Sequence, residues 1–207
     1  MNRLLLSAAA LAMAVGFPSA NAHSQDPGGF YLEAFGGVSM LRDADVNGNV
    51  VGKAPFDAGP VVGAAFGYDY ANSPFRSELE FAYRSADAKT FAGGATGDFA
   101  STSIMLNGYY DLKMGGPITP YVGAGAGYVT EIDFDIVGGA SPGEYNDRGG
   151  FAWQAMGGIN YAVTERIGLS GELRYFDAGR RTLTGSGGTI KADYASFEFV
   201  VGVGYLF

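Results

Sequence analysis

Hydrophobic and polar residues alternate along the last fifteen residues of the chain, Asp193 to Phe207. Successive side chains of a β-strand point to opposite faces, so such a stretch separates into two columns. One column is entirely apolar or aromatic and contains Phe197, Phe199, Val201, Val203, Tyr205 and Phe207. The other column mixes polar, small and aliphatic side chains, namely Ser196, Glu198, Val200, Gly202, Gly204 and Leu206. The apolar column is as long as a strand that crosses a lipid bilayer, about ten residues.

The same pattern recurs upstream and predicts eight strands. Their expected ranges are 30–39, 59–69, 76–86, 101–112, 120–130, 150–162, 167–177 and 193–207. Four connections are long and rich in Gly, Asp and Ser, at 40–58, 87–100, 131–149 and 178–192. Three connections are short, at 70–75, 113–119 and 163–166. This alternation predicts an all-β fold, an eight-stranded antiparallel up-and-down transmembrane barrel with long extracellular loops and short periplasmic turns.

The first 22 residues have the pattern of a cleaved signal peptide. Arg3 supplies a positive start, Leu4 to Phe17 an apolar core, and Ala20-Asn21-Ala22 a cleavage site. We therefore predict a signal peptide at 1–22 and a barrel domain at 23–207. Beyond this segment, the longest uncharged run, 114–130, contains several glycines and prolines that would break a helix. A membrane location then requires a closed barrel, because only helices and closed sheets satisfy the backbone in lipid.

Composition excludes several kinds of chemistry. Acidic residues outnumber basic ones, 21 to 13, which argues against nucleic acid or anionic lipid headgroups as the main partner. The chain has no cysteine and one histidine, His23, which lies outside every predicted strand. Zinc or haem ligation is therefore not expected, and a catalytic histidine held among rigid strands is lacking. We predict no cofactor and no enzymatic activity.

An acidic stretch marks the third long connection, which contains Glu131, Asp133, Asp135, Glu144 and Asp147. Carboxylates suit calcium, but this spacing matches neither the EF-hand nor the RTX pattern. We therefore expect a solvated loop. Divalent ions that bridge this loop to lipopolysaccharide phosphates are the alternative.

Charged residues also occur in the columns that face away from the predicted lipid surface. The expected lumen set is Glu33, Arg76, Glu78, Glu80, Arg84, Glu172, Arg174 and Glu198. Side chains fill the interior of an eight-stranded barrel, and an unpaired buried charge is costly. We therefore favour a paired polar core over a charged gate for ions. In this core, Arg174 is predicted to pair with Glu198, Glu172 or both.

The end of the chain resembles the C-terminal signature by which outer-membrane barrels are delivered to their assembly machinery. Gly202, Tyr205 and Phe207 carry this likeness, although Val200 stands where the pattern usually has a polar residue. Two further stretches resemble small outer-membrane β-barrels of the OmpA-type and opacity-type porin-like family. They are Pro120 to Tyr128 and the hairpin from Gly157–Tyr161 to Glu172–Asp177. The peptidoglycan-binding module of full OmpA-type proteins is not expected here, since the sequence stops at Phe207.

The resemblance implies an outer-membrane location in a Gram-negative cell. The implied partners are outer-membrane lipid, lipopolysaccharide, the barrel assembly machinery and a host or surface ligand bound by the loops. The expected function is a surface-exposed anchor that displays its loops, in envelope integrity, adhesion or host interaction. A narrow porin for small ions or solutes is the alternative. A soluble lipocalin-like carrier would need an apolar interior and a polar exterior, the reverse of the predicted columns.

Overall fold

A computed structural model describes residues 28–48, 52–91, 93–139 and 142–207. The predicted signal peptide, its cleavage site and His23 lie outside the described residues. The described residues form eleven strands: β1 (Gly29–Leu41), β2 (Ala44–Gly48), β3 (Gly52–Ala54), β4 (Gly59–Asp69), β5 (Phe75–Phe91), β6 (Ala95–Asp111), β7 (Ile118–Val137), β8 (Gly143–Asp147), β9 (Gly150–Ala162), β10 (Ile167–Gly185) and β11 (Gly188–Leu206). No described helix is long and apolar enough to cross a membrane.

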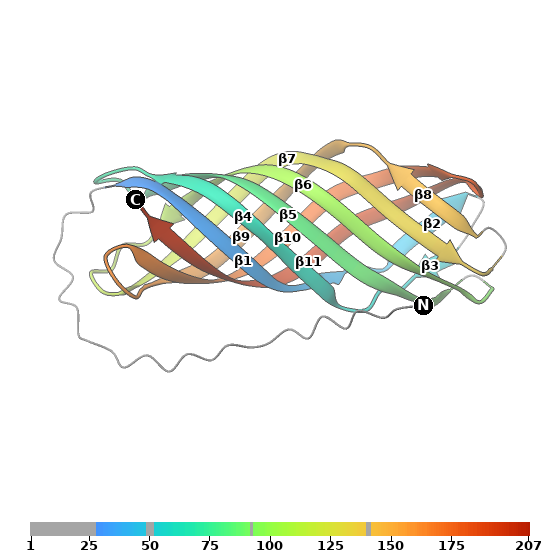
Figure 1. The fold of residues 1–207 in the computed structure, drawn as a ribbon, viewed down its shortest axis with the longest axis horizontal. Coiled ribbons are helices and arrows are strands. Elements are labelled where there is room, and N and C mark those ends of the chain that lie inside the picture. The colour runs from blue at the N-terminus through green and yellow to red at the C-terminus, as the bar shows by residue number, and fades with distance from the viewer. Residues whose placement is uncertain (1–27, 49–51, 92, 140–141) are drawn as a thin grey trace.

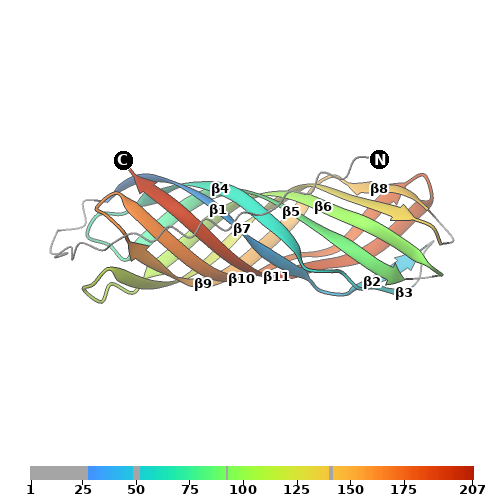
Figure 2. The same ribbon diagram turned by 60° about the horizontal axis from the view of Figure 1, so that its bottom comes forward.

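Eight of these strands close an antiparallel ring (Figures 1 and 2). Around the ring, β1 pairs with β4, and the order continues through β5, β6, β7, β9, β10 and β11. The pairing of β11 with β1 completes the circle. The short β8 joins the wall between β7 and β10, above β9. The predicted eight-stranded barrel is confirmed.

Inward-facing glycines let large side chains lie flat inside this narrow ring. A Cβ atom added at Gly123 would stand 2.5 Å from the Tyr109 ring on the adjacent strand. One added at Gly67 would stand 2.2 Å from the Tyr31 ring. Real Cβ atoms do not approach other atoms so closely, so a side chain at either position would push the tyrosine out of place.

The predicted long loops are the part of the fold that differs. In segment 87–100, β5 continues to Phe91 and β6 begins at Ala95, and a turn is described at 93–94. In segment 178–192, β10 and β11 continue in the same way. Segments 131–149 and 40–58 contain the end of β7 with β8, and β2 with β3. These segments were expected to be loops because of their Gly, Asp and Ser content. The described side chains of 87–100, 131–149 and 178–192 nevertheless alternate, with mainly apolar residues on the inside and mainly polar residues on the outside.

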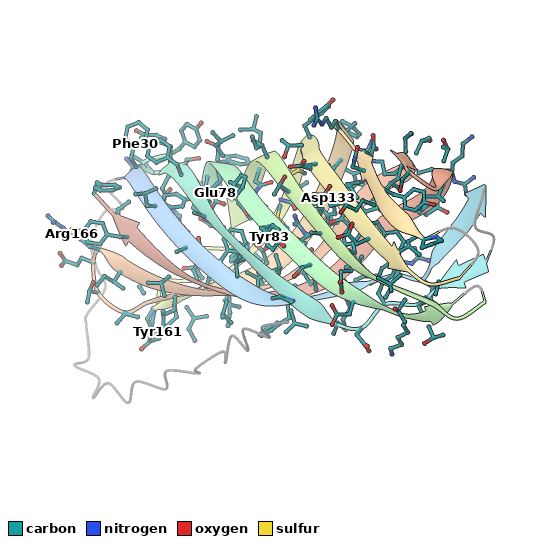
Figure 3. The ribbon with its side chains drawn as sticks, turned by 45° about the vertical axis from the view of Figure 1, so that its right-hand side comes forward. Phe30, Glu78, Tyr83, Asp133, Tyr161 and Arg166 are labelled. Carbon is teal, nitrogen blue, oxygen red and sulfur yellow. The ribbon has the colours of Figure 1, made fainter. Side chains whose placement is uncertain are left out.

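The barrel therefore has two tiers. The lower tier, which ends in the short turns and the C-terminus, comprises residues 28–41, 59–84, 103–128, 150–176 and 196–207. The upper tier comprises the described residues of 42–58, 85–102, 129–149 and 177–195. In Figure 3 the barrel lies on its side, with the lower tier at the left and the upper tier at the right. Phe30, Tyr161 and Arg166 lie toward the left end, and Asp133 lies farther to the right.

The outer face of the lower tier is apolar. Side chains that are about half exposed or more include Leu79, Phe81, Leu106, Val122, Phe151, Leu173, Phe199, Val201 and Val203. The outer face of the upper tier is polar, with exposed Asp87, Lys89, Thr96, Asp98, Glu131, Asp133, Asp135, Glu144, Thr182, Thr184 and Lys191. The predicted apolar columns thus point outward, toward lipid, in the lower tier only.

The interior of each tier has the opposite character to its outer face. The upper tier encloses one apolar cluster: Ala88, Ala95, Phe99, Met105, Val129, Ile132, Phe134, Ile136, Tyr145, Ala152, Phe176, Ala178, Leu183, Ile190 and Tyr194. This cluster reaches down to Met105, Ala152 and Phe176, at the boundary between the tiers. Below it, the lumen is polar and charged. The arrangement expected of a lipocalin-like barrel therefore occurs here, but only in the upper tier.

Candidate functional site: the barrel lumen

The predicted lumen charges all lie on the inner face of the lower tier. Seven of them are buried, namely Arg76, Glu78, Glu80, Arg84, Glu172, Arg174 and Glu198. The eighth, Glu33, is half-buried. Strands β1, β5, β10 and β11 supply these side chains, which reach the lumen because the side chains of a strand alternate between its two faces.

Arg76 organises the bottom of the lumen. Its Nε donates to Asp111 at 2.8 and 3.1 Å. Its Nη1 donates to the Tyr31 hydroxyl at 2.9 Å and to Glu78 at 3.0 Å, and Tyr31 itself donates to Glu78. Three tyrosine rings surround the guanidinium, with centroids 5.8, 4.6 and 5.1 Å away: Tyr31, Tyr109 and Tyr121. This group holds one arginine against two carboxylates.

Arg174 organises the middle of the lumen. Nε and Nη2 donate to Glu172 at 3.0 and 2.8 Å, and Nη1 donates to Glu80 at 2.9 Å. Glu198 lies directly opposite Arg174 in the register of β10 and β11, but their nearest charged atoms are 3.9 Å apart. Glu172 is thus a close partner, while Glu198 is a distant one. Glu80 reaches Arg174 from β5, which neighbours neither β10 nor β11.

Arg84 closes the top of the polar layer. It is fully buried, and its Nε and Nη2 donate to Glu198 at 2.5 and 3.3 Å. Its Nη1 donates to the Ser103 hydroxyl at 2.8 Å, and its guanidinium lies 4.2 Å from the centroid of the Phe176 ring. Because Phe176 belongs to the apolar cluster, Arg84 joins the polar layer to the apolar layer above it.

Neutral side chains complete the network, and the sequence analysis did not identify them. Asn107 donates to Glu80 at 3.0 Å, and Gln154 donates to the Asn107 side-chain oxygen at 2.8 Å. Asn107 and Asp111 share the inward column of β6 with Met105 and Tyr109. That column mixes apolar with polar residues, so its face could not be recognised by charge alone.

Carboxylates exceed arginines in this lumen. The six acidic side chains are Glu33, Glu78, Glu80, Asp111, Glu172 and Glu198, against three arginines at positions 76, 84 and 174. Glu33 accepts a hydrogen bond of 2.5 Å from the Ser170 hydroxyl. It is the lumen carboxylate that forms no ion pair with any arginine among the described residues.

Three cavities interrupt the filled interior. The lower end holds one of about 230 Å³, which contacts the turn at 163–166. A cavity of about 20 Å³ lies deeper among the charges, and Glu33 lines both. A third, of about 30 Å³, lies inside the apolar cluster of the upper tier. Between the second and the third stand the Arg84 layer and Phe176, so the interior is occupied by side chains at that level.

The predicted acidic loop is a row on the outer wall instead. Asp87, Asp98, Asp135 and Glu144 stand directly opposite one another across β5, β6, β7 and β8. Burial, and then the Asp87 carboxylate, raise the pKa of Asp98 above its usual range. Burial and the Glu131 carboxylate raise the pKa of Asp133 in the same direction. Within the described part of the chain, no three acidic, histidine or cysteine side chains converge on a metal site.

The three residues of the predicted assembly signal lie at the end of β11. Gly202 faces inward, where an added Cβ atom would meet the Glu33 carboxylate and the Ser170 hydroxyl. Tyr205 and Phe207 face outward and are 42% and 66% exposed, with ring centroids 5.4 Å apart. Their recognition by the assembly machinery stays a prediction.

A closed antiparallel barrel with an apolar belt outside and a paired polar network inside is a transmembrane β-barrel. Residues 7–207 match the family model described as the outer membrane protein beta-barrel domain, and the chain belongs to this family. The predicted outer-membrane location and family are thereby confirmed. Outer-membrane barrels generally have short periplasmic turns, so we expect the lower tier to end in the periplasm and the upper tier to stand outside the cell.

The outer membrane protein PagN of Salmonella typhimurium is 30% identical over 223 residues, which cover 86% of this chain and 90% of PagN. Among solved structures, Neisserial surface protein A is similar, with a TM-score of 0.60 and 24% identity. The match covers 86% of this chain and 97% of that protein. The outer membrane protein OprG from Pseudomonas aeruginosa is also similar, with a TM-score of 0.58 and 18% identity. The match covers 86% of this chain and 96% of OprG. None of these names describes an enzyme, in agreement with the sequence prediction.

Proposed function

We propose that this protein is a non-conducting anchor that holds a folded upper tier above the outer membrane and presents it to ligands outside the cell. The observation that carries this proposal is the filling of the lumen. In the lower tier, arginines and carboxylates pair across the interior, and in the upper tier an apolar cluster occupies the same axis. An ion would have to cross both layers, and in the second most of the side chains are apolar. The polar groups there are the Ser101 and Tyr194 hydroxyls, which bond each other, and the Arg181–Asp147 pair.

The outer wall supplies the surface for contact. Its polar side chains stand on hydrogen-bonded strands, so a ligand would bind a preformed face and would not have to order a loop. Lipopolysaccharide surrounds the base of this wall, and adhesion or host interaction would use the part above it. The acidic row could bridge to lipopolysaccharide phosphates through divalent ions. The assembly machinery would bind β11 before insertion.

Planar bilayers test the anchor against the narrow porin. Refolded protein is expected to give no stable conductance steps, and Glu80→Gln should not change this result, because Glu80 is engaged by Arg174 and Asn107. A known porin inserted by the same protocol verifies the assay. Stable cation-selective steps that shift with Glu80→Gln would establish the porin instead.

Thiol labelling tests presentation, because the chain has no cysteine of its own. Thr184→Cys, exposed on the upper tier, should react with a membrane-impermeant maleimide on intact cells. Glu165→Cys, exposed in a short turn of the lower tier, should react only after the outer membrane is opened. Equal labelling of both variants on intact cells would contradict the proposed orientation.

A further inference from the structure

The cavity of about 230 Å³ at the lower end, here called the vestibule, opens toward the periplasm and ends blindly inside the barrel. Its walls include Tyr31, Glu33, Asp69 and Ser170, and two arginines, Arg76 and Arg166, also line it. Above it lie the Arg174 and Arg84 layers and then the apolar cluster. A cavity needs roughly 10–15 Å³ of this volume to hold one water. The vestibule therefore has room for a molecule of several non-hydrogen atoms.

Glu33 stands at the inner end of the vestibule, where the larger and the smaller cavity meet. Glu33 accepts a hydrogen bond from Ser170, a neutral donor. Arg76 and Arg174 line a cavity together with Glu33, but Arg76 already holds Asp111 and Glu78, and Arg174 holds Glu172 and Glu80. Arg166, on the vestibule wall, is exposed and donates to the Tyr205 hydroxyl. The negative charge of Glu33 therefore lacks a counter-charge from the described part of the chain, although the residue is half-buried.

The surroundings of Glu33 favour an organic cation over a metal ion. Among the described residues, no three carboxylate, histidine or cysteine side chains lie close enough together to hold a metal ion. The vestibule is also much larger than a single ion. Tyr31 lines its wall, and the ring of this tyrosine already accepts the guanidinium of Arg76 at 5.8 Å. Aromatic faces attract such delocalised cations.

We infer that the vestibule binds a small organic cation of the guanidinium or alkylammonium class from the periplasmic side, with Glu33 as its counter-ion. Ser170 holds one oxygen of Glu33, which leaves the other to accept from the ligand. Asp69 and the Asn160 side chain supply further oxygen acceptors along the wall. This inference does not depend on what the upper tier binds, and it requires no passage through the barrel.

Calorimetric titration with methylguanidinium chloride, at constant ionic strength, tests the site in refolded protein in detergent micelles. The native chain should bind the probe at one site, and Glu33→Gln should weaken binding about tenfold or more. The matched control is Glu131→Gln, which removes an exposed carboxylate on the upper tier, outside the vestibule, and should leave binding unchanged. Heat-modifiable migration verifies that each variant is folded. Equal weakening in both variants, or sodium competing as well as the probe, would overturn the inference.

A second measurement leaves Glu33 in place, in case its replacement prevents folding. Thr119→Cys puts a single thiol on the vestibule wall. A cationic methanethiosulfonate reagent should react faster there than an anionic reagent of similar size, and methylguanidinium should protect the thiol. Equal rates for the two reagents, or no protection by the probe, would show that the vestibule does not select cations.

Discussion

Arg174 is the lumen residue whose replacement tests the ion pairs of the lumen most directly. It is 4% exposed and holds Glu172 and Glu80 at 2.8 and 2.9 Å. Arg174→Ala should cost on the order of 3–5 kcal/mol in unfolding free energy, because it leaves buried carboxylates without a partner. Urea unfolding in micelles measures the change. The control is Arg180→Ala on the same strand, whose exposed pair with Asp193 should contribute no more than about 1 kcal/mol.

A double-mutant cycle adds a check on the register. Replacing Arg174 and Glu172 together should cost less than the sum of the single changes, since the two side chains are in direct contact. Additive losses would mean that the two residues do not share the lumen.

The acidic row makes the opposite prediction for a residue on the outer wall. Asp135 lies directly opposite both Asp98 and Glu144, and like charges placed so are destabilising. Asp135→Asn should therefore raise the unfolding free energy by about 0.2–1 kcal/mol at neutral pH. Thr182→Asn, exposed on β10 opposite Lys191 and outside the acidic row, is the control and should have no measurable effect. A loss of stability in Asp135→Asn would imply that the row is already neutralised by a bound cation.

The same row fixes the sign of a pH effect. The pKa values of Asp98 and Asp133 are raised, so the folded state holds protons that the unfolded state has lost. Their contribution to stability is complete below the usual aspartate pKa, about 3.9, and is lost as pH rises through the raised values. Hydrogen bonds from Arg180 lower the pKa of Asp193, whose small contribution is lost as pH falls instead. Unfolding midpoints from about pH 4 upward should therefore fall less steeply in Asp135→Asn than in the native chain.

Alternation along single strands was enough to predict which face each lumen charge occupies. Partners were harder to predict, because they depend on the stagger of strands that are far apart in sequence. Glu80 meets Arg174 across the interior, and Glu198 turns to Arg84 although Arg174 is its neighbour in the ladder. The Arg76 partner Asp111 was missed, since its column was not separated from the opposite one.

At the scale of the element, the upper part of β7 carries the clearest prediction. Phe134 is 3% exposed, and its ring lies 5.9 Å from that of Phe56. Phe134→Ala should cost about 3–5 kcal/mol locally, through lost burial and the cavity left behind. The control is Val137→Ala at an outward position that is 65% exposed, where we expect a change within about 0.5 kcal/mol.

Limited proteolysis of intact cells shows which tier loses stability in Phe134→Ala. Cleavage in Phe134→Ala should be confined to the upper tier, while the lower tier stays in the membrane. Resistance equal to that of the native chain would mean that the apolar cluster does not hold the upper tier together.

The end of β11 yields a separate prediction about assembly. Phe207→Asp should reduce the heat-modifiable, membrane-inserted fraction, since the outward aromatic column is the proposed recognition element. Thr182→Asp introduces the same charge on the exposed wall of the upper tier and serves as the control. Normal insertion of Phe207→Asp would show that this aromatic residue is not needed for delivery.

The strands of the lower tier were predictable because their polar and apolar columns are long. Those of the upper tier were not, although the alternation is present: Asp133 and Asp135 point outward between inward Ile132, Phe134 and Ile136. A strand whose outward residues are polar or glycine has the composition of a loop. Its two-residue alternation of apolar and polar side chains is what distinguishes it from one. The reversal of the columns within one strand was the decisive signal.

For the whole molecule, the apolar belt predicts that the protein leaves the membrane only with detergent. Unboiled protein should migrate faster on a denaturing gel than boiled protein, because a closed ring of ladders resists the detergent. Release in soluble form after osmotic shock would contradict the barrel in the membrane. The apolar belt was fully predictable from the columns. The apolar cluster inside the upper tier was not, because it depends on the clustering of residues from many strands.

The uninterrupted strands β5, β6, β10 and β11 also have a mechanical consequence. Each runs from the periplasmic turns to the outermost tip without leaving its ladder, apart from local bulges. A pull on the tip, as from a cell held to a surface in flow, acts along the strands. Many ladder bonds then bear the load together in shear, where a hinged loop would peel one bond at a time. The barrel would transmit tension from a bound surface directly into the membrane.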